Sequence, residues 1–157
     1  MDPKRFVKIL IKSLMPERTG FVGVAGTRRL GEDAVWWNQQ HWKQGLHRGC
    51  VLHGEDETTS QMTYYGNPGE VAVLDGLFLA AKYRTLKKLD LSKPDYFTGD
   101  WDFYDIHYTT QAVKKNYHNY VVPIMMLHHS FGELAGRDSW HQNRAAYIER
   151  TDLPLEV

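Results

Sequence analysis

Hydrophobic residues recur with helical spacing near the start of the chain. Asp2-Pro3 is a favourable helix start, because an aspartate caps the helix and proline suits its first position. Pro16 then ends the segment. Apolar residues lie three or four positions apart, with lysines on the other face: Phe6, Ile9, Leu10 and Leu14 against Lys4, Lys8 and Lys12. The pattern predicts an amphipathic helix.

Two later segments predict helices by the same spacing. One runs from about Asp102 to Asn116, and Asn116 is a suitable C-terminal stop. The other begins at Asp138 or Ser139 and carries Trp140, Tyr147 and Ile148.

Short apolar runs between glycine, proline or polar residues predict strands over 21–25, 50–53 and 120–127. Segment 70–82 fits a buried strand, a turn at Asp75-Gly76 and a second apolar element. The remaining stretches predict loops: an aromatic-rich one with a short helix over 26–46, then 55–60, 90–100 and a loose tail from Thr151. The fold class is α/β, in a single domain over residues 1–157.

Charge and composition exclude several classes of function. The 157 residues include 19 basic and 19 acidic side chains, so the chain lacks the basic surface of a general nucleic-acid binder. It also lacks a polybasic segment that would hold it to an anionic membrane, and no apolar stretch approaches the ~20 residues of a membrane span. The single cysteine, Cys50, excludes an internal disulfide and is consistent with a cytoplasmic location.

The most informative region runs from Tyr96 to Gly132. A helix over 102–116 followed by a returning strand over 120–127 brings Asp105 and His128 towards one edge of the sheet. An aspartate in the first helical turn is favoured as the anion and can accept a proton from a hydroxyl. The alternative is that Asp102 caps the helix, Asp105 lies in solvent and the histidines pack.

This region resembles the C-terminal half of GT-A-fold glycosyltransferases of the family-2 type. The matching pieces keep the family's order along the chain: Val73–Lys82 with its Asp75-Gly76, Tyr96–Gly99, Trp101–Ile106, Asn116-Tyr117, Val121–Ile124 and His128–Gly132. The resemblance implies a mixed-sheet GT-A-like fold that transfers a sugar from a nucleotide-sugar donor to an acceptor hydroxyl.

The resemblance also implies roles for individual residues. Asp105, with Asp102 beside it, would be the catalytic base. His128 or His129 would approach a Mg²⁺ or Mn²⁺ ion that neutralises the leaving diphosphate. The remaining candidates would bind the substrates. Asp75 and Gly76 would border the substrate pocket, and the rings of Trp36, Trp37 and Trp101 could stack on sugar rings. For His41, His47, His53, His118 and His141 we expect surface or packing roles.

The family's nucleotide-binding half normally precedes these motifs and ends in an Asp-x-Asp pair. We therefore expect a region that begins after that pair and depends on a missing N-terminal segment or on a homo-oligomer. Two other hypotheses remain: a non-catalytic carbohydrate-binding or assembly module, and a metal hydrolase built on Asp105, His107, His128 and His129. The latter lacks a close-spaced histidine signature.

Overall fold

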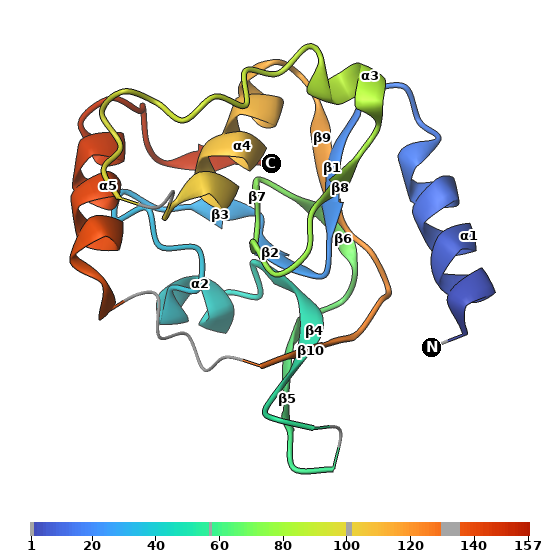
Figure 1. Cartoon of the computed structure of the whole chain (residues 1–157). Helices are drawn as coiled ribbons and strands as arrows, with labels where there is room; N and C mark the ends of the chain where they lie inside the picture. Colours follow the sequence, from blue (N-terminus) through green and yellow to red (C-terminus); the bar gives the residue numbers. More distant parts are fainter. Residues whose placement is uncertain (1, 57, 100–101, 130–135) are drawn as a thin grey trace.

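The computed structural model describes residues 2–56, 58–99, 102–129 and 136–157 and shows a mixed α/β fold (Figure 1). The helices are α1 (Pro3–Leu14), α2 (Gln39–Lys43), α3 (Tyr83–Leu86), α4 (Tyr104–Lys114) and α5 (Asp138–Ile148). The Asp2 side chain caps α1 by accepting from the Lys4 N–H, as the sequence predicts. Among the described residues, no helix has the length and apolar composition that crossing a membrane requires.

Two sheets carry most of the strands. The first has the order β6 (Gly69–Val71), β9 (His118–Val121), β1 (Thr19–Gly23) and β8 (Ala80–Ala81). The second has the order β10 (Met126–His128), β4 (His47–His53), β2 (Ala25–Thr27) and β7 (Val73–Leu74), with β5 (Gln61–Gly66) pairing with β4. The β1–β9 and β10–β4 pairs are parallel and the others antiparallel, so both sheets are mixed.

The predicted strands over 21–25 and 120–127 are each divided between the two sheets. The first becomes β1 and β2, which flank Val24, and the second becomes β9 and β10. Pro123 lies in the second break, where proline cannot donate to a strand ladder. Each of these chain segments therefore crosses from one sheet to the other.

The C-terminal residues pair with the predicted loop over 26–46. β11 (Leu155–Glu156) is antiparallel to β3 (Arg29–Leu30), and the Arg28 guanidinium donates to the Val157 carbonyl. The segment from Thr151, for which the sequence predicts a loose tail, thus ends in a short strand.

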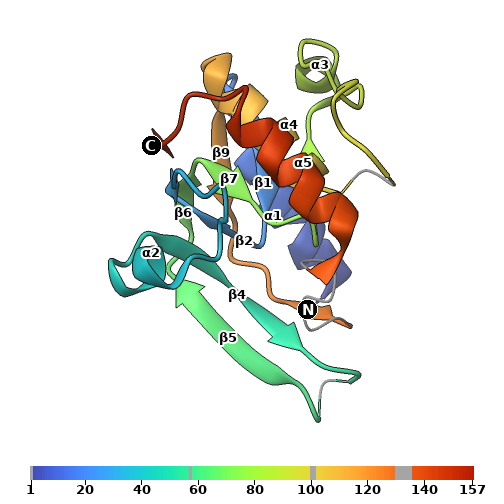
Figure 2. The same ribbon diagram turned by 90° about the vertical axis from the view of Figure 1, so that its left-hand side faces the viewer.

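Helix α4 lies between α1 and α5, which stand at opposite edges of the molecule (Figure 1; Figure 2). Asn119 of β9 is fully buried and links this helix to the sheets. Its amide donates to the carbonyls of Thr109 in α4 (2.8 Å) and Ala72 (3.2 Å), and its oxygen accepts from the Phe21 N–H (3.0 Å). These bonds fix the first turns of α4 beside the end of β7, where the candidate site lies.

Candidate functional site

Asp105 in the first turn of α4 lies against the turn that follows β7. One carboxylate oxygen accepts from the Gly76 N–H (3.0 Å) and the other from the Ile106 N–H (2.8 Å). Asp75 lies beside it and accepts from the Leu77 N–H (2.7 Å). Both residues are half-buried, and the fold holds their carboxyl groups close together.

Two histidines approach this pair from the second sheet. His128 at the end of β10 is in register with His53 at the end of β4, and their ring centroids are 5.5 Å apart. Both histidines act electrostatically on Asp75. The structure therefore links Asp105 to His128 through Asp75 and adds His53 to the group.

The pKa values of both acids are raised. Burial raises the pKa of Asp105 to about 7, and the charge of Asp75 adds to the effect. The pKa of Asp75 is raised mainly by burial, while the Leu77 N–H and the two histidines oppose the shift. Asp105 is therefore not the fully ionised first-turn aspartate that the sequence predicts, but a carboxyl group that changes protonation near neutral pH.

Tyr104 joins α4 to the same turn. Its hydroxyl donates to the Gly76 carbonyl (2.9 Å), and the Gly76 N–H donates back to Asp105. A Cβ atom at Gly76 would collide with the Tyr104 hydroxyl and lie 3.3 Å from the Asp105 Cβ. Glycine thus permits the close approach that places Asp75 and Asp105 side by side.

Asp102 lies outside α4 and contacts α5 instead. Its carboxylate accepts from the Ser139 hydroxyl, and Arg137 Nη1 lies 3.9 Å away. The Asn143 amide donates to its main-chain carbonyl (2.9 Å). In the structure Asp102 fixes α5 against the start of α4.

The aromatic candidates have different environments. Trp36 is 3% exposed and packs against Tyr65, with ring centroids 5.5 Å apart. Trp37 is 38% exposed and lies 5.5 Å from the Trp140 ring. Of the two, Trp37 has a face that a sugar ring can reach, whereas Trp101 lies outside the described residues.

The metal candidates do not form a ligand set. His129 is exposed at the end of β10. His107 points elsewhere, since its ring nitrogen bonds to the Gln111 amide (2.7 Å) and its ring packs on Phe97. Within the described ranges, no three His, Cys, Asp or Glu side chains are placed to hold a metal ion.

Sequence reasoning missed Tyr104, His53 and Tyr65 as neighbours of the acids. Burial raises the pKa of Tyr104 to about 12, and the charges of Asp105 and then Asp75 add to the shift. Burial also raises the pKa of Tyr65 to about 12, with a further contribution from the charge of Asp75. Tyr104 precedes Asp105, and this adjacency was the available signal. His53 and Tyr65 lie on β4 and β5, and only tertiary structure brings them near.

Comparison with known proteins gives one result. The sequence model described as "Glycosyltransferase like family" matches residues 1–150. No curated protein and no solved structure matches the chain.

Proposed function

Since the chain belongs to the glycosyltransferase-like family, we propose that it transfers a sugar from a nucleotide-sugar donor to an acceptor hydroxyl, with Asp105 as the general base. The observation that carries the proposal is the Asp75–Gly76–Asp105 arrangement at the start of α4. A GT-A fold is part of the same proposal, supported by the mixed sheets.

The raised pKa of Asp105 suits this role. A base works best when its pKa lies near the working pH, and burial brings the pKa of Asp105 to about 7. The backbone N–H groups of Gly76 and Ile106 hold both carboxylate oxygens in place. Asp75 opposes ionisation of Asp105 and so strengthens its affinity for a proton.

The proposed reaction is a single displacement. The acceptor oxygen attacks the anomeric carbon while the bond from that carbon to the diphosphate oxygen breaks. Asp105 takes the acceptor's proton, and the nucleoside diphosphate leaves with the bonding electrons. A single base of this kind gives inversion at the anomeric carbon.

The Mg²⁺ or Mn²⁺ ion implied by the family resemblance has no step in this scheme. A bound ion would neutralise charge on the leaving diphosphate. Within the described residues, no three His, Cys, Asp or Glu side chains converge to hold the ion, so its binding stays a prediction from the resemblance.

The test is release of nucleoside diphosphate from UDP- and GDP-sugars, with and without Mn²⁺, for the wild type and Asp105→Asn. We expect the variant to lose about 10²–10⁴-fold in rate, the usual contribution of a general base. Asp95→Asn is the matched control, because Asp95 is exposed. Thermal melting of all three proteins checks that they fold.

Equal rates for the wild type and Asp105→Asn would remove Asp105 from the mechanism. Glycan binding without nucleotide dependence or turnover would favour the non-catalytic module instead.

A further inference from the structure

Helix α1 has more apolar surface than the protein itself covers. Its inner face packs on the core through Phe6, Ile9, Leu10 and Leu14, and the Phe6 ring lies 6.0 Å from Phe78. A second apolar row, Val7, Ile11 and Met15, is 50%, 59% and 71% exposed. These side chains follow one another at intervals of one helical turn.

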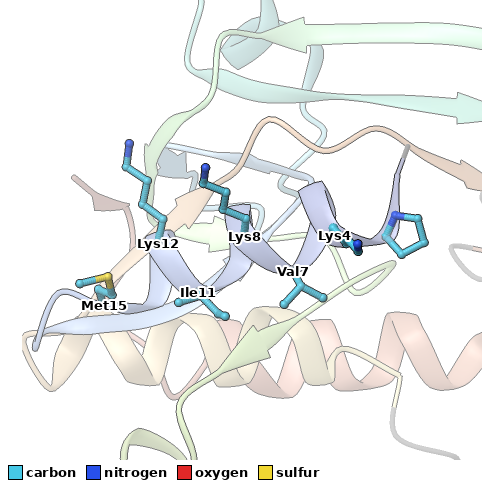
Figure 3. Close-up of a pocket in the computed structure, with 7 residues that line it drawn as sticks. Lys4, Val7, Lys8, Ile11, Lys12 and Met15 are labelled. Atoms are coloured by element: carbon cyan, nitrogen blue, oxygen red, sulfur yellow. The ribbon is translucent and has the colours of Figure 1, made fainter.

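A parallel row of lysines borders the exposed apolar row. Lys4, Lys8 and Lys12 recur at the same interval and are all exposed. Figure 3 shows Lys8 and Lys12 pointing to one side of the helix and Val7 and Ile11 to the other. A surface depression here is lined only by residues of α1 and by Met15.

The charge of α1 differs from that of the rest of the chain. The helix carries Lys4, Arg5, Lys8 and Lys12 and no carboxylate. Since the whole chain has 19 basic and 19 acidic residues, 15 basic and 19 acidic residues remain outside the helix. Within the described part of the chain, no ion pair involves Lys4, Lys8 or Lys12.

We propose that α1 docks on an anionic lipid surface. Its axis would lie in the plane of the surface, with Val7, Ile11 and Met15 among the acyl chains and the lysines at the headgroups. Helices that lie in this interface have a cationic polar face, an apolar face and low overall hydrophobicity. Long lysine side chains can bury their stems and keep the ammonium group among phosphates.

Two features favour a lipid surface over another protein. The exposed row lies on a helix at the edge of the molecule (Figure 1), where a flat surface can reach it. A second copy of this chain would bring two rows of lysines together, which like-charge repulsion opposes.

The folded helix also explains why the sequence shows no polybasic segment. The lysines are separated by three residues each and gather on one face only in the helical state. The inference does not depend on the proposed transfer reaction.

The experiment is co-sedimentation of the full chain with vesicles of phosphatidylcholine alone or with 30% phosphatidylglycerol, a composition we choose for the assay. We expect binding to the anionic vesicles only, weakened by salt. The triple variant Lys4→Gln, Lys8→Gln, Lys12→Gln should lower the partition coefficient by about 100-fold, since three near-surface charges are removed.

Two further triple variants complete the test. Lys43→Gln, Lys87→Gln, Lys114→Gln removes the same charge from α2, the residue after α3, and α4, and should keep most of the binding. Val7→Ser, Ile11→Ser, Met15→Ser should also abolish binding, while thermal melting confirms that each variant folds.

Absence of binding to anionic vesicles, or equal losses for both lysine triples, would overturn the proposal. So would binding to neutral vesicles with the same affinity. A dimer in analytical ultracentrifugation that the serine triple dissolves would assign the face to a second copy instead.

Discussion

At the scale of single residues, the site depends on where two carboxyl groups lie. Asp105 and Asp75 are far apart in the sequence, yet the Gly76 N–H bonds directly to Asp105. The charge of Asp75 raises the affinity of Asp105 for a proton, because two like charges at close range repel. Burial adds to this effect and is its larger cause at Asp105.

The raised pKa of Asp105 predicts how transfer depends on pH. A base must be deprotonated, so kcat/KM should rise about tenfold per pH unit below pH 7 and level off above it. Product release measured from pH 5 to 9, with donor and acceptor well below their KM values, checks this. A flat profile through pH 7 would argue against Asp105 as the base.

Adding a side chain at Gly76 should create a steric clash in the turn after β7. In Gly76→Ala the new Cβ would push the Tyr104 hydroxyl away and break its bond to the Gly76 carbonyl. We expect a loss of about 1–3 kcal/mol in the free energy of unfolding, as for other overpacked positions.

Urea unfolding measures that loss. Gly136→Ala is the control, because among the described residues a Cβ there meets no atom within 4 Å. If both variants unfold at the same urea concentration, the turn tolerates a side chain and the close approach is not essential.

At the scale of elements, the structure corrects where one helix begins. The sequence predicts a helix from about Asp102, but α4 starts at Tyr104 after Phe103, whose φ is 80°. The Asp102 carboxylate instead accepts from Ser139 in α5. Periodicity cannot show this, because the pairing of two helices is a tertiary contact.

The hydrogen bonds of Asn143 in α5 should contribute strongly to the contact between α5 and the residues before α4. It is fully buried, its oxygen accepts from the Thr98 N–H (2.7 Å), and its amide donates to the Thr98 and Asp102 carbonyls (3.0 and 2.9 Å). Asn143→Ala leaves these groups unpaired and should cost about 2–4 kcal/mol of stability. Urea unfolding measures it.

Gln142→Ala serves as the neighbouring control. Its side chain is exposed and accepts a solvent-exposed bond from the Thr98 hydroxyl (2.9 Å), so a change within about 0.5 kcal/mol is expected. A loss at Asn143→Ala no larger than this would mean that the bonds to Thr98 and Asp102 contribute little.

At the scale of the whole molecule, buried titratable groups make stability depend on pH. His47 is fully buried against the rings of Trp36, Trp42 and Tyr65. Burial, with the charge of His41, lowers its pKa from 6.5 to about 4. Between these values the unfolded chain binds more protons, so the contribution of His47 to stability is full above pH 6.5 and falls as pH drops towards 4.

The substitution His47→Gln should remove this loss of stability at low pH. Chemical unfolding of the wild type and the variant from pH 4 to 7 compares their slopes, and His141→Gln is the control at an exposed histidine. Asp105 acts oppositely, since its raised pKa costs stability as pH rises from 3.8 to about 7. Parallel curves for the wild type and His47→Gln would contradict the prediction.

The sequence by itself predicted the three longer helices, the α/β class and the resemblance to glycosyltransferases, but not α3. Helices are local, so the Asp2 cap, the spacing of Phe6 to Leu14 and the stop at Asn116, whose φ is 60°, could be read from neighbouring residues. It also predicted that Asp105 and His128 approach one edge of the sheet, and the resemblance added Asp75 as a substrate-binding candidate.

Tertiary structure alone decided the rest. Strand pairing is non-local, so the splits at Val24 and Pro123, the pairing of β11 with β3 and the approach of His53 to Asp75 do not appear in the pattern. The pKa of a carboxyl group depends on what surrounds it. The value of about 7 at Asp105 therefore arises only once burial and Asp75 act on it together.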